Sequence, residues 1–148
     1  MKIYISGPIS GLKPAAVRKV FDAAAKKIRQ FGHTPADPSA LPDPEIKNPQ
    51  HHHYLQRDLR LLWECQMLCA LPGWEDSSGC LRELWFASRE SIPCVEFRYL
   101  SDAFRSAEEI ASAHGSHTSV TLRLGFVGCW PFFRIQKMCG VRPRKRRK

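Results

Sequence analysis

The sequence predicts an α/β protein, in which a mostly parallel sheet of four to five strands lies between two layers of helices. Short β-branched or apolar runs alternate along the chain with longer segments whose apolar residues recur at three- and four-residue steps. Glycine and proline separate many of these segments, as expected at turns. With 43% hydrophobic and 25% charged residues, the 148-residue chain has the composition and length of one globular domain.

The first elements form a strand, helix and strand. Residues 2–6 are a β-branched and aromatic run that stops at Gly7, which predicts a strand entering a turn. Pro14 suits the first turn of a helix, and Gly32 suits its end. The apolar stripe of this helix is expected to contain Val17, Val20, Phe21, Ala24, Ile28 and Phe31. A short strand is expected at residues 33–36.

The alternation continues to about residue 113. In order, the pattern predicts a proline-rich loop at residues 37–49, a helix at 54–64, a strand at 66–71, a helix at 79–90, a strand at 92–97 and a helix at 101–113 capped by Ser101. In the helix at 79–90 we expect one side to carry Leu81, Leu84, Trp85 and Ser88. This order is typical of a flavodoxin- or Rossmann-like three-layer sandwich.

Such sheets bind ligands in the crevice outside the carboxyl ends of their strands. Three loops are expected at that edge, at residues 6–12, 37–49 and 72–79. Candidate functional residues are therefore expected in these loops and in the helices that follow them.

The formal charge of +9 belongs to the end of the chain. Residues 1–115, the predicted domain, hold 14 basic and 14 acidic residues, whereas residues 116–148 hold 9 basic residues and no acidic one. The charge gives no argument for nucleic-acid binding by the domain itself. The final segment, Arg142 to Lys148, is either a disordered solubilising tail, which we favour, or a nonspecific nucleic-acid contact.

Other features favour a cytoplasmic protein without a metal. The chain has no apolar run long enough for a transmembrane helix or a signal peptide, and we expect no membrane association. The six cysteines form no CxxC pair and are interpreted as free thiols. The tract His51-His52-His53 has no cysteine or carboxylate at ligand spacing, so no metal site and no cofactor are expected.

Two candidate features precede the third helix. The turn from Gly7 to Gly11 lets backbone N–H groups approach a ligand, although a tight turn before a helix needs glycine in any case. Asp58 shares a helical face with Leu55, Leu59 and Leu62. A carboxylate on that face is costly unless it is paired or functional, and pairing with Arg57 at the rim is the structural alternative.

The third feature is the polar, glycine-bounded segment that begins at Gly73 and enters the helix at 79–90. Ser77 and Ser78 can cap this helix or, with its free N–H groups, hold a phosphate. Glu83 lies one turn inside the helix. Periodicity alone leaves open whether Glu83 faces solvent or has a function.

Together these blocks resemble the nucleoside 2-deoxyribosyltransferase-like superfamily, and above all its small, mostly uncharacterised bacterial and phage branch. The resemblance covers residues 1–97. It is carried by the opening KIYISGPISG, by Asp58-Leu59, and by the element from Trp74 to Ala87 with its GxxxEL pattern at Gly79 to Leu84.

The resemblance implies a role for each matching residue. Glu83 falls on the family's nucleophile, and Asp58 falls on the carboxylate that assists at the glycosidic centre. Ser77 resembles the residue that contacts phosphate in the branch hydrolysing deoxynucleoside 5′-monophosphates. The implied substrate-binding residues are Tyr4, Gly7, Pro8, Ile9, Ser77 and Gly79.

The resemblance implies cleavage or transfer of the N-glycosidic bond of a nucleoside or nucleotide, in a homo-oligomer of two or more subunits. One departure is Gln66, where relatives commonly have an aspartate that tends to be structural. Two other functions stay open: a non-catalytic nucleotide-binding or sensing module, and a nucleic-acid-binding accessory protein acting through the basic tail.

Overall fold

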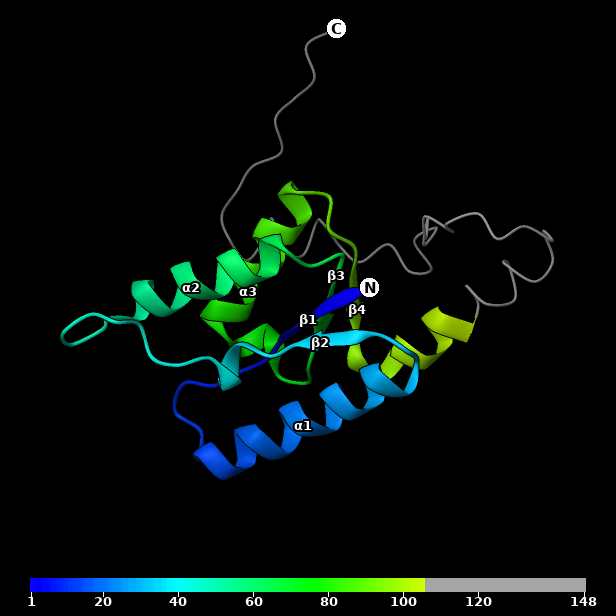
Figure 1. The fold of residues 1–148 in the computed structure, drawn as a ribbon, viewed down its shortest axis with the longest axis horizontal. Coiled ribbons are helices and arrows are strands. Elements are labelled where there is room, and N and C mark those ends of the chain that lie inside the picture. Colours follow the sequence, from blue (N-terminus) through cyan, green and yellow to red (C-terminus); the bar gives the residue numbers. More distant parts are fainter. Residues whose placement is uncertain (106–148) are drawn as a thin grey trace, which may run out of the picture.

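The computed structural model describes residues 1–105, which form a parallel sheet covered by helices on both faces (Figure 1). The strands and helices are, in chain order, β1 (Lys2–Ser6), α1 (Pro14–Gln30), β2 (Thr34–Ala36), α2 (His51–Trp63), β3 (Met67–Ala70), α3 (Ser78–Arg89) and β4 (Cys94–Glu96). Three short 3-10 helices interrupt the connections: η1 (Pro38–Ala40), η2 (Trp74–Asp76) and η3 (Phe97–Tyr99). The fold class predicted from the sequence is confirmed.

The strand order is β2-β1-β3-β4, and all three pairings are parallel. In the centre of the sheet Tyr4 pairs with Leu68, and Ser6 pairs with Ala70. From β1 the chain passes to α1 on one face, and from β3 it passes to α3 on the other (Figure 1). The carboxyl ends of β1 and β3 are therefore the point where ligands bind in open α/β sheets.

Alternation along β1 gives the sheet two separate cores. Ile3 and Ile5 face α1, whereas Tyr4 faces α2 and α3. The buried residues that α1 contributes to the first core are Val17, Phe21, Ala24, Ala25 and Ile28. Val20, which the sequence placed on this stripe, is instead 45% exposed, because the buried stripe is narrower than the predicted one.

Helix α2 begins three residues earlier than predicted, at His51. The backbone N–H of Gln50 donates to Nδ1 of His53 at 2.9 Å, so the histidine tract begins and caps the helix. Helical structure also begins at residue 100, which places Ser101 inside the helix and contradicts its predicted role as the cap. The rest of that predicted helix and residues 116–148 lie outside the described residues.

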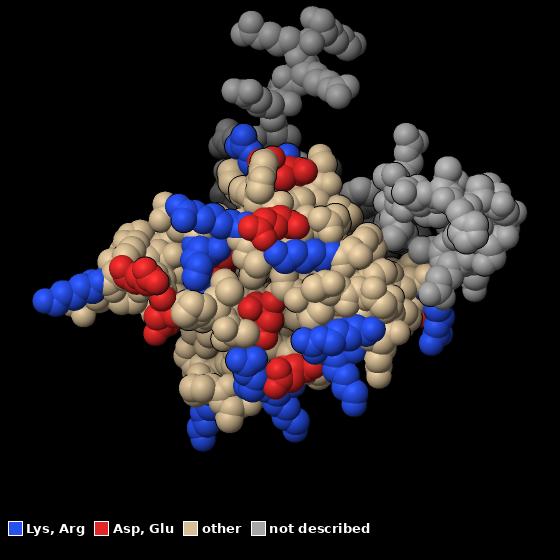
Figure 2. All heavy atoms as spheres, viewed as in Figure 1, with Lys and Arg blue, Asp and Glu red and all other residues tan. Residues whose placement is uncertain are grey.

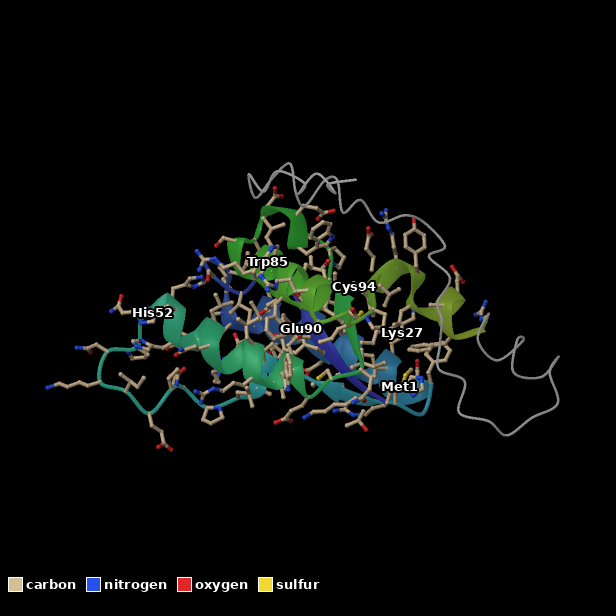
Figure 3. The ribbon with its side chains drawn as sticks, turned by 90° about the horizontal axis from the view of Figure 1, so that it is seen from above. Met1, Lys27, His52, Trp85, Glu90 and Cys94 are labelled. Atoms are coloured by element: carbon tan, nitrogen blue, oxygen red, sulfur yellow. The ribbon has the colours of Figure 1, made fainter. Side chains whose placement is uncertain are left out.

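The inner face of α3 differs from the predicted one. Its buried residues are Cys80, Glu83, Leu84 and Ala87, whereas Trp85 is 40% exposed and lies under the guanidinium of Arg89. Figure 3 shows Trp85 on α3, which lies beside α2 over the same face of the sheet. The prediction for the inner face was right for Leu84 and wrong for Trp85. The observed inner face contains Glu83, whose side chain is buried against the sheet.

Gly7 is required by packing at the end of β1. A Cβ atom at this position would lie 2.8 Å from Cδ1 of Leu71 and 3.1 Å from the ring of Phe21. We expect Gly7→Ala to lower the free energy of unfolding by about 1–3 kcal/mol, because the core must move to admit the methyl group. Chemical denaturation measures this change.

Gly79→Ala is the matched control for that measurement. A Cβ at Gly79 would meet its nearest atoms at 3.8 and 4.0 Å, which are ordinary contacts. Its free energy of unfolding should stay the same or rise slightly, because alanine favours the helix. Equal loss in both variants would contradict the steric argument at Gly7.

Candidate active site

Glu83 is held by two hydroxyl groups of the central strand. The hydroxyl of Tyr4 donates to Oε1 at 2.8 Å, and that of Ser6 donates to Oε2 at 2.6 Å. Tyr4 and Ser6 are two residues apart in β1, so their side chains lie on the same face of the sheet, the face that α3 covers. Each carboxyl oxygen of Glu83 therefore has one fixed donor.

Glu83 is only 7% exposed, and burial raises the pKa of its carboxyl group from 4.5 to about 7. The hydrogen bonds from Ser6 and Tyr4 oppose this rise, and the charge of Asp58 adds to it. A carboxyl group with a pKa near neutrality exchanges readily between its neutral and ionised forms, as expected at a reactive site.

Asp58 supplies the second carboxylate from α2. It is 8% exposed, and burial raises its pKa, while the hydrogen bond and charge of Arg57 oppose that rise. Nη2 of Arg57 lies 2.8 Å from Oδ1 of Asp58. The pairing with Arg57, which the sequence offered as the structural alternative, is therefore present, and Asp58 also lies on the inner face of the helix.

Tyr4 and Asp58 both interact electrostatically with Glu83. Burial raises the pKa of Tyr4 well above its usual value, and the charges of Glu83 and Asp58 raise it further. Tyr4 therefore stays protonated at neutral pH and acts as a hydrogen-bond donor. The structure brings three predicted residues, Tyr4, Asp58 and Glu83, together on one face of the sheet.

The start of α3 forms the rim of this site. Ser77 is the N-cap residue, and its hydroxyl accepts from the backbone N–H of Cys80 at 3.4 Å, which confirms the predicted cap. Cys80 is buried, and burial raises the pKa of its thiol to about 11, so the thiol is neutral. His51 approaches Gly79, with Cε1 4.0 Å from the position of a Cβ there. The N-termini of α2 and α3 are thus neighbours.

The remaining predicted residues lie in the loop after β1. Gly7 packs against the core, and Pro8 lies beside the loop after β3, with its Cγ 3.5 Å from the position of a Cβ at Gly73. Ile9 is 40% exposed. These residues are at the carboxyl edge of the sheet, but the hydrogen bonds to Glu83 come from β1 itself.

Two features of this centre were not predicted from the sequence. One is the contact of Ser6 with Glu83, and the other is the donation of hydrogen bonds by Arg57 to carbonyl groups of the loop at residues 37–49. The alternation of Tyr4 and Ser6 in a strand contained the information for Ser6, since both must face the same side. Gln66, the departure from relatives, accepts a hydrogen bond from the backbone N–H of Lys2 at 2.7 Å. This glutamine therefore ties the start of β1 to β3.

Among residues 1–105, no group of three or more His, Cys, Asp or Glu side chains is arranged to hold a metal ion. Over the same range, no helix is long and apolar enough to cross a membrane. The face in Figure 2 shows basic and acidic side chains interspersed over the described surface, which agrees with the even charge balance of the domain.

The amino-acid sequence matches the family model described as "Domain of unknown function (DUF4406)" over residues 1–96. The chain belongs to the DUF4406 family. The matched part ends with β4 and contains Tyr4, Ser6, Asp58 and Glu83. No curated protein gives a significant match to the sequence.

Solved structures share the fold of this DUF4406 chain. A 2-deoxyribosyltransferase from the psychrotolerant bacterium Bacillus psychrosaccharolyticus has a TM-score of 0.52 and 20% identity, over 65% of this chain and 71% of that one. A conserved protein from Enterococcus faecalis V583 has a TM-score of 0.52 and 23% identity, over 64% of this chain and 61% of that one. The predicted resemblance to the nucleoside 2-deoxyribosyltransferase-like superfamily is confirmed at the level of the fold.

Proposed function

We propose that this protein cleaves or transfers the N-glycosidic bond of a nucleoside or nucleotide, with Glu83 as the nucleophile. The observation that carries the proposal is a buried carboxyl group held by two hydroxyl donors beside a second buried carboxylate. Enzymes that act at a sugar C1′ through a covalent intermediate use two carboxyl groups in different environments.

In the first step the ionised carboxylate of Glu83 attacks C1′ of the sugar. The C1′–O bond forms while the C1′–N bond breaks, and the electron pair leaves with the base. Asp58, whose pKa is raised by burial, gives the departing nitrogen a proton or orients the sugar. The hydrogen bonds from Tyr4 and Ser6 hold Glu83 in one orientation for this attack.

In the second step water or another base attacks C1′ and gives its proton to the carboxylate of Asp58, while the C1′–O bond to Glu83 breaks and Glu83 leaves as a carboxylate. Attack by water gives hydrolysis, and attack by a base gives base exchange. The fold shared with a 2-deoxyribosyltransferase supports a 2-deoxyribosyl group as the sugar. Both outcomes need the same covalent intermediate.

We further propose that Ser77 and the start of α3 receive the 5′ end of the substrate. The free N–H groups of a helix N-terminus favour an anionic group such as a phosphate. Ser77 is half-buried at this position, next to the buried Cys80 and nearly two turns before Glu83. A homo-oligomer is likewise part of the proposal, as the resemblance of the sequence implies.

A second candidate function is nucleotide binding without turnover. The observation that favours it is the closed network around Glu83: both its oxygens are bonded, and every buried side-chain nitrogen or oxygen in residues 1–105 has a partner. In that case the hydroxyl donors would hold Glu83 as a fixed acceptor for a ribose hydroxyl.

One assay separates the two functions. The full-length protein is incubated with a panel of deoxynucleosides, ribonucleosides and their 5′-monophosphates, with and without a second free base. We expect chromatography to detect released base, and exchanged nucleoside where a second base is the acceptor. Thermal stabilisation by a panel member without any base release would instead support the binding module and overturn the catalytic proposal.

A further inference from the structure

Arg57 connects the site to the loop before α2. Its Nε and Nη2 donate to Oδ1 of Asp58 at 2.9 and 2.8 Å. Its Nη1 donates to the carbonyl of Pro42 at 2.7 Å, and Nη2 also donates to that of Pro38 at 3.2 Å. One guanidinium group therefore joins the second carboxylate of the site to two carbonyl groups of the loop.

The composition of the loop limits the hydrogen bonds that it makes with itself. Residues 37–49 contain four prolines, which have no backbone N–H and so limit the hydrogen bonds that the loop makes with itself. The carbonyl of Pro38 accepts from the backbone N–H of Leu41 at 3.3 Å, and Arg57 adds a second donor to it. Arg57 also donates to the carbonyl of the exposed Pro42, and both bonds come from the helix that carries Asp58.

The same contacts leave one oxygen of Asp58 available. Both hydrogen bonds from Arg57 go to Oδ1, and no residue within the described range bonds Oδ2. The side chain of Asp58 keeps 12% of its surface exposed. A carboxylate held through one oxygen has a fixed direction, so Oδ2 is the atom that can meet a ligand.

We propose that Arg57 is a positioning residue, which sets the direction of Asp58 and the place of the 38–42 loop together. The inference rests on the proposed function, because it assigns Arg57 to the same glycosidic chemistry. A substrate that contacts the 38–42 loop would thereby affect the orientation of the Asp58 carboxylate at the reacting centre. Arginine is required, since its planar fork reaches three acceptors in different directions and a lysine ammonium group does not.

The test compares Arg57→Lys with Arg18→Lys. The first variant keeps the charge and loses the fork. The second is the matched control, because Arg18 pairs with Asp37 of the same loop at 3.3 Å without any contact to Asp58. The measurements are kcat and KM for base release, the melting temperature, and the pKa of Asp58 from the carboxyl 13C shift, assigned with Asp58→Asn.

We expect Arg57→Lys to lower kcat by about tenfold or more, with a smaller change in KM, because Asp58 is no longer held in one direction. The pKa of Asp58 should rise, since the hydrogen bonds from Arg57 lower it and the variant loses the fork that makes them while it keeps the charge. Arg18→Lys should leave kcat within about twofold of the wild-type value and leave the pKa of Asp58 unchanged.

A lower melting temperature in Arg57→Lys, with kcat and the pKa of Asp58 unchanged, would overturn the proposal and leave Arg57 a structural residue. Absence of base release by the wild-type protein would overturn the proposed function instead. In that case the titration of Asp58 alone tests the role of Arg57. A change in the pKa of Asp58 in Arg57→Lys but not in Arg18→Lys supports positioning, and an unchanged pKa in both variants rejects it.

Discussion

Replacing Glu83 by glutamine is expected to lower the rate of base release by about 1,000-fold or more. The amide keeps the size of the side chain, and its oxygen can accept from one of the two hydroxyl groups while its NH2 group donates to the other, but it cannot form the ester with C1′. Loss of the nucleophile removes the covalent route entirely. The measurement is the initial rate of free-base release, normalised to the amount of folded protein by circular dichroism.

Glu90→Gln is the matched control for this experiment. Glu90 follows the last residue of α3, is exposed, and is labelled in Figure 3 at the far end of the same helix. The same chemical change there should leave the rate within about twofold of the wild-type value. Substantial activity in Glu83→Gln, with Glu90→Gln unchanged, would reject Glu83 as the nucleophile.

A covalent intermediate gives a second, independent readout. Wild-type protein quenched during turnover should carry one added sugar group, located by mass spectrometry on the peptide that contains Glu83. Glu83→Gln should carry none. An adduct on another residue would move the nucleophile elsewhere while leaving the glycosidic reaction intact.

Elements whose causes are local in the chain were predictable from the sequence. Strand β1 was predicted with its observed bounds, because a β-branched run stops at Gly7, and α1 was predicted to begin at Pro14 as it does. The cap of α3 at Ser77 was equally local. These features depend on backbone preferences and on neighbouring residues, which one sequence displays directly.

The inward direction of Glu83 was not predictable from periodicity. Apolar residues lie on two sides of α3, and the large ring of Trp85 outweighs the smaller Cys80 and Ala87 in any estimate of the buried face. The actual face is decided by contacts with β1, 77 and 79 residues away in the chain, through Ser6 and Tyr4. Only the resemblance to a known family singled out Glu83 in advance.

The contacts of Arg57 were unpredictable for the same reason. Pairing with Asp58 is a local event, and the sequence offered it as an alternative. The carbonyl groups of Pro38 and Pro42 lie 19 and 15 residues away, in a loop whose course no pattern in the sequence defines. The positions of loops at the sheet edge follow from the assembled structure, and this edge is where the candidate chemistry lies.

The buried carboxyl group of Glu83 should also make stability depend on pH. Its pKa in the folded protein, about 7, lies above the ordinary value of 4.5, so the folded protein binds the proton more tightly than the unfolded chain. The stabilising contribution is complete below pH 4.5 and is lost as the pH rises through 7. The loss amounts to about 3 kcal/mol.

Glu83→Gln isolates this contribution because glutamine does not titrate. The difference in free energy of unfolding between Glu83→Gln and wild type should increase by about 3 kcal/mol in favour of the variant between pH 4.5 and pH 8. Base release by the wild type should rise over the upper part of the same range, because the attacking form is the ionised one. A pH-independent difference in stability would contradict the raised pKa. An increase in activity that accompanies a decrease in stability would show one group, Glu83, producing both effects with opposite sign.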